Sequence, residues 1–167
     1  HNDPSYAPPR RSYEQARIMG GGSSINGQLF NRGAPTDFDG WRDLGVAGWG
    51  WDDVLPYFKK AERDLDFPES DWHGDEGRIL VRRLFEEQWT GHTHAARKAL
   101  EAAGYDYIED QNGAFRDGFF PLTISNAFDR RVSAAVGYLD PPTRRRPNLT
   151  IMAETRVSEI LFNGLKA

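Results

Sequence analysis

The residues best suited to chemistry lie in a glycine-rich segment near the start of the chain. Gly20, Gly21 and Gly22 are followed by two serines, and Asn26 and Gly27 come soon after. Each glycine costs roughly 0.5–1 kcal/mol of backbone entropy relative to alanine, so folding alone does not favour such a run. The run does supply backbone without side chains, whose N–H groups can lie against a flat or anionic ligand. The segment therefore predicts a cofactor-binding loop.

Two common phosphate-binding motifs do not fit this loop. A P-loop needs a Lys directly after its last glycine, and no Lys follows Gly22. A dinucleotide fingerprint needs G-x-G-x-x-G between a strand and a helix, but Ile25 occupies the position of the third glycine. Both readings fail.

A third pattern matches at many more positions. The segment resembles the first signature of the glucose-methanol-choline (GMC) oxidoreductase family. It differs from that signature at one position, where Met19 stands in place of the usual branched aliphatic residue or Trp. The matching positions are Ala16, Arg17, Gly20, Gly21, Gly22, Ser23, Ile25, Asn26, Phe30, Gly33 and Asp39.

The resemblance continues along nearly the whole chain. Residues 39–62 are similar to a family stretch that ends in "DVLPYFKKAE", and Trp72-His73-Gly74 is similar to a short turn before a strand. Residues 131–167 resemble a further family run, and the similarity is weakest in residues 84–118. Within this family, the chain resembles a choline dehydrogenase-like flavoprotein.

The resemblance implies FAD-dependent oxidation of an alcohol. A base removes the hydroxyl proton while a hydride passes to the flavin. Ile25 stands where some family members carry a His that attaches the flavin, so we expect non-covalent FAD. The residues expected to contact the cofactor are Gly20, Gly21, Gly22, Ser23, Asn26, Gly27, Gln28, Leu29 and Val157. Asn26 could instead merely turn the chain, and Val157 could be an ordinary strand residue.

Other parts of the family pattern are missing from the sequence. The family's Rossmann fingerprint, its second signature and its catalytic His do not occur here. We therefore expect an internal fragment with no catalytic residue of its own. Its partners would be the N- and C-terminal parts of the same protein and a small-molecule alcohol. The catalytic base would lie outside the chain.

The histidines and paired aspartates have simpler interpretations than catalysis. His92 and His94 stand two residues apart on an expected helix, so they point to different faces and should be exposed rather than bind a metal. We expect no metal site. His73 reads as a turn residue, and Asp52 or Asp53 as a helix cap.

Composition narrows the function classes further. The chain has 167 residues without cysteine, which excludes disulfides and thiolate metal sites. A net charge of −4 argues against a nucleic-acid surface. No apolar stretch approaches the roughly 20 residues that cross a membrane, and we expect a cytoplasmic protein.

The pattern of apolar residues predicts an α+β fold. The family resemblance implies that the chain holds part of an FAD-binding domain and part of an antiparallel-sheet substrate domain, with no Rossmann βαβ unit. We expect a cofactor loop and arm in residues 1–40, a substrate-domain portion in 41–148, and strands returning to the FAD-binding domain in 149–167. We expect a short helix that begins at Ser23 or Ser24 and three further helices over residues 52–63, 90–103 and 132–139. The helix over 90–103 should turn one face inward, formed by Ala95, Ala99, Leu100 and Ala103. Expected strands are 78–82, 119–125, 149–152 and 157–162, with a turn at Asn163-Gly164. Trp41, Trp49 and Trp51 should pack under the second helix.

Two other functions stay open. A hydroxynitrile lyase of the same fold would hold a flavin that never cycles. From a different class, the chain could be a non-catalytic binding module.

Overall fold

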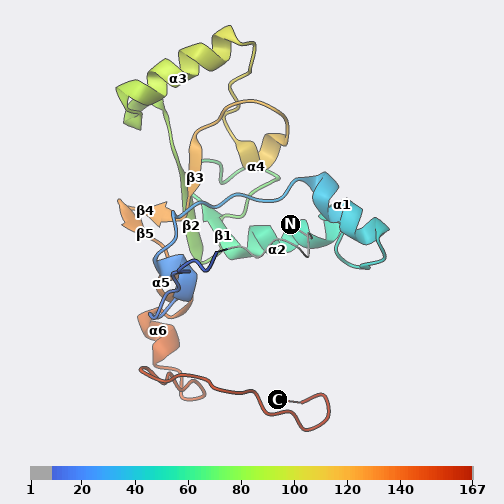
Figure 1. The fold of residues 1–167 in the computed structure, drawn as a ribbon, viewed down its shortest axis with the longest axis vertical. Coiled ribbons are helices and arrows are strands. Elements are labelled where there is room, and N and C mark those ends of the chain that lie inside the picture. The colour runs from blue at the N-terminus through green and yellow to red at the C-terminus, as the bar shows by residue number, and fades with distance from the viewer. Residues whose placement is uncertain (1–8, 167) are drawn as a thin grey trace.

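The computed structural model describes residues 9–166, and a small mixed sheet lies at its centre (Figure 1). Its strands are β1 (Glu62–Asp64), β2 (Ile79–Leu84) and β3 (Leu122–Ile124), in the order β1-β2-β3. β1 pairs parallel with β2, and β2 pairs antiparallel with β3. The α+β class is confirmed, but the sheet is mixed rather than wholly antiparallel, because the chain returns to β2 through a long loop instead of a hairpin.

β2 supplies the centre of the core. Its residues alternate between buried and half-buried, as expected for a strand with one covered face. Ile79 and Val81 pack with Ala127 and Val132, and Phe30 covers this cluster from the side. Ala127 lies in a small hairpin formed by β4 (Asn126–Ala127) and β5 (Arg130–Arg131), and Val132 directly follows that hairpin.

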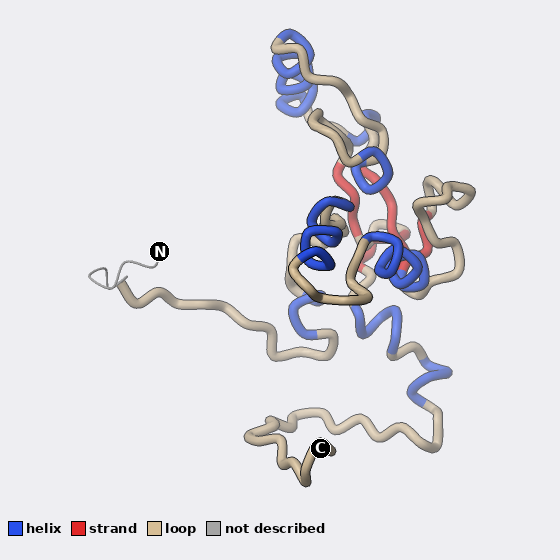
Figure 2. Tube along the Cα trace, turned by 90° about the vertical axis from the view of Figure 1, so that its right-hand side faces the viewer, coloured by secondary structure: helices blue, strands red, loops and turns tan. Residues whose placement is uncertain are grey.

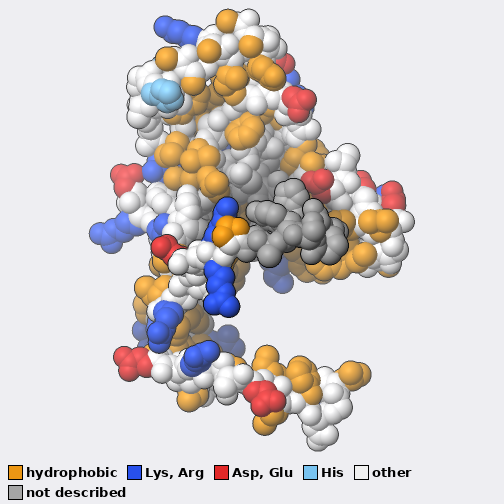
Figure 3. All heavy atoms as spheres, in the orientation of Figure 1, with side chains coloured by type: hydrophobic (Ala, Val, Ile, Leu, Met, Phe, Trp, Pro, Cys, Tyr) orange, Lys and Arg blue, Asp and Glu red, His pale blue; other side chains and the backbone are white. Residues whose placement is uncertain are grey.

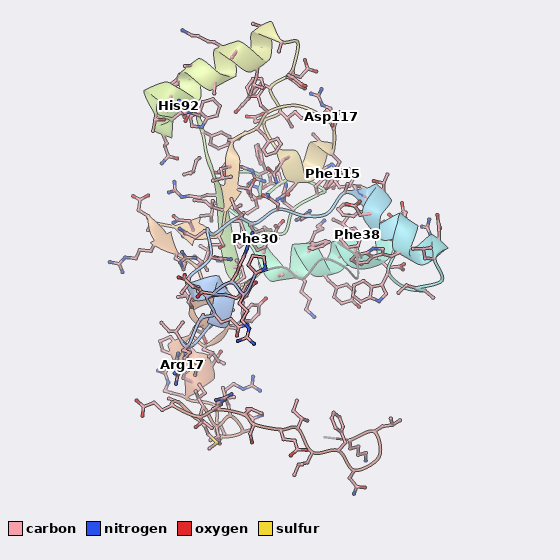
Figure 4. The ribbon with its side chains drawn as sticks, viewed as in Figure 1. Arg17, Phe30, Phe38, His92, Phe115 and Asp117 are labelled. Atoms are coloured by element: carbon pink, nitrogen blue, oxygen red, sulfur yellow. The ribbon has the colours of Figure 1, made fainter. Side chains whose placement is uncertain are left out.

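Two helices and their aromatic side chains form one flank of the molecule. They are α1 (Pro35–Asp43) and α2 (Trp51–Ala61). Trp51 is 6% exposed and packs 5.0 Å from Phe115 and 5.9 Å from Phe38, measured between ring centroids. Figure 4 shows Phe38 and Phe115 on this same flank. Trp41 and Trp49 are about half exposed, so only Trp51 is a core residue of the three tryptophans.

The N-cap of α2 lies two or three residues earlier than predicted. Gly50 is the N-cap, and neither Asp52 nor Asp53 holds that position. The carboxylate of Asp53 accepts a hydrogen bond from the Gly50 N–H at 3.0 Å. The aspartate therefore still satisfies a free donor at the helix start, although from inside the first turn.

α3 (Gly91–Ala102) confirms the third expected helix, with Thr90 as its cap and Gly104 in the left-handed conformation after it. The inward face was predicted wrongly: Ala95, Ala99, Leu100 and Ala103 are all exposed. The helix stands away from the sheet (Figure 1) and borders an open apolar hollow of about 430 Å³, so little of its surface is covered. His92 is exposed as expected, whereas His94 is half-buried and lies 5.9 Å from the Trp89 ring.

The remaining helices are short. They are α4 (Gln111–Ala114), α5 (Ala134–Tyr138), α6 (Pro141–Arg144) and the 3-10 turns η1 (Gly21–Ser24) and η2 (Glu86–Gln88). None of the helices in residues 9–166 combines the length and apolarity needed to cross a bilayer.

The two ends of the described chain are extended. Figure 2 shows the segment before the glycine loop and the segment after α6 running as loops away from the body. The strands predicted at 149–152 and 157–162 are not formed, because no described residue pairs with them and a strand needs a neighbour for its N–H and C=O groups. The turn at Asn163-Gly164 is confirmed by the bridge between Asn163 and Lys166. Exposed hydrophobic side chains line this C-terminal segment (Figure 3).

Candidate functional site

The glycine loop begins with a tight left-handed turn. Gly20 and Gly21 have φ of 89° and 55°, values that favour glycine over other residues. A Cβ on Gly20 would lie 2.5 Å from Ser24 Oγ and 3.1 Å from Ala135 Cβ. Gly20 is therefore required by the packing of the loop against α5.

The short helix expected from Ser23 or Ser24 is not present in that form. η1 ends at Ser24, and Leu29 instead makes a bridge with Ile124. The reason is that both serine hydroxyls donate hydrogen bonds to carbonyl groups earlier in the chain. Ser23 Oγ donates to the Gly20 carbonyl at 2.6 Å, and Ser24 Oγ donates to the Met19 carbonyl at 2.8 Å. They close the turn before them and do not cap a helix after them.

The central part of the loop is held by β5 and the start of α5. Ser23 Oγ accepts from the Ala134 N–H at 2.9 Å. Arg131 Nη1 donates to the Ser23 carbonyl at 3.1 Å and to Asn26 Oδ1 at 2.7 Å. Residues more than 100 positions away in the sequence thus fix the shape of the loop.

The exit of the loop joins the edge of the sheet. Gln28 has a φ of 65°, and its carbonyl accepts from the Ser125 N–H at 2.8 Å. Its side-chain oxygen accepts from Asn126 Nδ2 at 2.9 Å. Phe30 then donates its N–H to the Thr123 carbonyl, so that the loop leaves along β3.

One side of the loop is open. Neither Gly22 nor Gly27 has a left-handed φ, and a Cβ on either would meet no atom of residues 9–166 within 4 Å. Contacts among the described residues therefore do not account for these two glycines. Ile25 and Leu29 are each more than half exposed beside them. Bare backbone and apolar side chains thus face outward together, as a surface for a flat ligand requires.

The structure brings together eight of the nine predicted site residues, those from Gly20 to Leu29. Val157 is apart: it lies in the extended C-terminal segment, its side chain is 74% exposed, and it is not drawn to the loop by any hydrogen bond among the described residues. His92 is also distant: Figure 4 shows it on α3 at the top of the view, far above Arg17, which precedes the glycine loop.

A second polar site was missed by the sequence analysis. We call it the ionic cluster; it comprises Glu62, Asp64, His73, Arg83 and Asp110, with Arg32 at its edge. His73 lies at its centre, and its Nδ1 is 2.8 Å from Glu62 Oε1 while its Nε2 is 2.7 Å from Asp110 Oδ2. The predicted turn residue is therefore a buried hydrogen-bonding centre.

The guanidinium groups complete the ionic cluster. Arg83 Nη1 contacts both oxygens of Asp64 at 2.7 and 2.6 Å, and its Nη2 donates to Asp110 at 2.7 Å. Arg32 is paired with Glu62, and both side chains are almost fully buried. Opposite charges are therefore matched throughout this buried site.

The pKa values follow from these contacts. Burial alone would lower the pKa of His73, but hydrogen bonds to Asp110 and Glu62 outweigh it and raise the pKa above 6.5. Burial would raise the pKa of Asp110, but the hydrogen bond from His73 and the charge of Arg83 lower it to about 2. Carboxylates at both ring nitrogens favour the imidazolium form, in which both nitrogens donate.

Glu62, Asp64 and His73 also converge closely enough to hold a cation. However, the carboxylates already accept hydrogen bonds from Arg32 and Arg83, and a metal would have to displace these guanidinium groups. We therefore interpret the ionic cluster as an ion-pair network that joins β1, β2 and the cap of α4.

One signal in the sequence could have revealed the ionic cluster. Arg83 stands two residues after Val81 and four after Ile79, so it continues the buried face of β2. An arginine in an inward register requires buried acidic partners. The alternation was visible in the sequence, but the acids come from two separate segments, β1 and the N-cap of α4, and could not be assigned to it.

Known proteins of one family match nearly the whole chain in sequence. The model of the GMC oxidoreductase family matches residues 7–167. The 5-(hydroxymethyl)furfural oxidase of Methylovorus sp. (strain MP688) is 49% identical over 152 residues, which cover 91% of this chain and 29% of that protein. The oxygen-dependent choline dehydrogenase of Pseudomonas putida (strain GB-1) is 42% identical over 158 residues, covering 89% and 26%.

Solved structures show the same relationship. Pyridoxine 4-oxidase from Mesorbium loti has a TM-score of 0.80 and 31% identity, covering 90% of this chain and 29% of that one. An FAD-dependent oxidoreductase from Chaetomium thermophilum has a TM-score of 0.75 and 26% identity, covering 90% and 27%. The chain thus spans less than a third of the length of these relatives. On the family match and these identities, the chain belongs to the GMC oxidoreductase family.

Proposed function

We propose that this chain is the flavin-contacting part of an FAD-dependent oxidoreductase that oxidises an alcohol. The observation that carries the proposal is the open side of the glycine loop. Neither the backbone conformation nor the packing of the described residues requires glycine at position 22 or 27. A ligand lying against the backbone accounts for both.

The loop residues would hold FAD in distinct ways. Gly20 and Gly21 set the turn, and the backbone at Gly22, Ser23 and Gly27 approaches the cofactor. When bound, the flavin accepts a hydride from the alcohol carbon. Backbone N–H groups at the loop would stabilise the negative charge that the ring then carries. Asn26, Gln28 and Leu29 would lie beside the ring.

Two further assignments rest on the family resemblance. Val157 would contact the adenine end of FAD through its backbone, once the extended C-terminal segment pairs with other parts of the protein. Ile25 has no nucleophilic atom at the position that carries the attaching His in some relatives, so we propose non-covalent FAD. We place the catalytic base in the parts of the relatives that this chain does not span. A cytoplasmic location stays a prediction.

The substrate class is a small-molecule alcohol. Two relatives provide the test compounds: one is named for 5-(hydroxymethyl)furfural and the other for choline. Both contain an alcohol group, so together they test the reaction class without assuming either as the natural substrate.

The test uses the protein encoded by the complete reading frame. Purified protein should show flavin absorbance, and acid precipitation should release FAD into the supernatant if attachment is non-covalent. Anaerobic addition of 5-(hydroxymethyl)furfural or choline should bleach the flavin. Bound flavin that no alcohol bleaches would favour the hydroxynitrile lyase, and protein without flavin affinity would favour the binding module.

A further inference from the structure

The side chain of Asn26 is held in one orientation. Its Oδ1 accepts two hydrogen bonds, one from the Gln28 N–H at 3.0 Å and one from Arg131 Nη1 at 2.7 Å. Its Nδ2 has no partner within residues 9–166, and the residue is exposed. The acceptor atom thus faces the protein, and the donor atom remains for a ligand.

The chemistry of the neighbours fixes this orientation. A reversed carboxamide would place its own N–H groups against the N–H of Gln28 and the guanidinium of Arg131, so donors would face donors. Neither neighbour can change role, because a backbone N–H and an arginine only donate. Asn26 can satisfy both only through its oxygen.

Arg131 is the residue that enforces this arrangement from a distance. Its backbone is fixed in β5, where it pairs with Asn126. Its Nη1 also binds the Ser23 carbonyl at 3.1 Å, so the guanidinium is held between the two ends of the loop's central turn. The asparagine therefore depends on a partner on a different element of the fold.

We propose that Arg131 is a positioning residue that makes Asn26 present only N–H donors to the flavin. The proposal rests on the proposed function, since it requires FAD to lie against the open side of the loop. A donor at that place stabilises negative charge on the reduced ring, which raises the reduction potential of the flavin. Arg131 would not touch the cofactor itself.

The test measures the reduction potential of the flavin in the complete protein. If Arg131 had a merely structural role, its substitution would leave this potential unchanged. In Asn26→Ala the donor is lost, so the potential should fall. In Asn26→Asp it should fall further, because a carboxylate would face the reduced ring. In Arg131→Gln the carboxamide is freed to turn, so the potential should fall and the rate of anaerobic flavin reduction should drop about tenfold, the effect of one hydrogen bond.

Arg130→Gln is the matched control. Arg130 is the neighbouring arginine on β5, it is exposed, and its side chain makes no hydrogen bond or ion pair with the described residues. This variant should keep the wild-type potential and rate. FAD content and the thermal unfolding midpoint are measured in every variant.

The outcomes separate the two proposals. Equal potentials in Asn26→Asp and the wild type overturn the inference, as do equal shifts in Arg131→Gln and Arg130→Gln. If Arg131→Gln does not fold, the order of the two Asn26 variants decides. Flavin-loaded variants with unmoved potentials overturn only this inference, whereas wild-type protein without bound flavin overturns the proposed function as well.

Discussion

Arg83 and Asp64 form a buried ion pair in which one guanidinium nitrogen contacts both carboxylate oxygens, at 2.7 and 2.6 Å. Neither side chain is exposed. Because the two residues belong to adjacent parallel strands, the pair joins β1 to β2 beyond Val81, the last buried apolar residue of β2. The ionic cluster extends outward from this pair.

Removing one partner of this pair should be strongly destabilising. Arg83→Met leaves Asp64 buried without its counter-charge, which costs about 3–5 kcal/mol in comparable cases. The thermal unfolding midpoint of the complete protein should fall accordingly. Arg63→Met, an exposed position on the neighbouring strand, is the control and should change it little. Similar midpoints for both variants would contradict the role assigned to the pair.

His73 should contribute stability mainly at neutral and acidic pH. Its pKa is raised above 6.5 in the folded protein. A group with a raised pKa stabilises fully below its unfolded pKa, and the contribution disappears as pH rises through the folded value. The difference in unfolding midpoint between wild type and His73→Gln should therefore be largest below pH 6.5 and shrink in alkaline buffer. A difference that grows with pH would show that His73 is neutral when folded.

Asp110 should behave in the opposite direction. Its pKa is lowered from 3.8 to about 2, so its stabilisation is complete above its unfolded pKa and is lost as pH falls towards about 2. Comparing wild type with Asp110→Asn by hydrogen exchange of the α4 amides should show the largest difference near neutral pH. The two proteins should become alike in strong acid. A gap that persists at the lowest pH would rule out the charge of Asp110 as its cause.

Substitution by alanine should affect the stability of the protein at Gly20 but not at Gly22. Gly20→Ala creates a contact of 2.5 Å with Ser24 Oγ at a φ of 89°, so it should destabilise the loop by about 1–2 kcal/mol. In Gly22→Ala the added methyl group meets no atom of residues 9–166 within 4 Å, so the unfolding midpoint of the flavin-free protein should stay unchanged. On the proposed function, Gly22→Ala should nevertheless weaken FAD binding about tenfold or more. Unchanged FAD affinity in Gly22→Ala would remove the main support for a flavin at this face.

The sequence predicted the local elements well where the signal was local. The helix over residues 90–103 was recognisable from the spacing of its apolar residues and from Gly104 after its end, which is left-handed as a helix stop requires. Its N-cap, Thr90, was found only in the structure. The glycine loop was also recognisable, because glycine runs and the family signature are properties of adjacent residues. Features of this kind need no knowledge of distant contacts.

Features that depend on distant partners could not be predicted. The ionic cluster joins Arg32, β1, β2 and Asp110, and no spacing rule connects them. The prediction of a buried face on α3 was wrong, because periodicity shows that a helix has an apolar side but does not show whether another element covers that side. The two C-terminal strands illustrate the same limit, because their apolar pattern is present but a strand also needs a partner.

The shape of the glycine loop depends on residues from other parts of the chain. Its turns are closed by its own serines, but its middle is tied to Arg131 and Ala134 and its exit to Thr123 and Ser125. Anyone wishing to graft this loop onto another scaffold would have to transplant residues 123–134 with it. The smallest portable unit is thus a discontinuous one, assembled from two stretches of chain about a hundred residues apart.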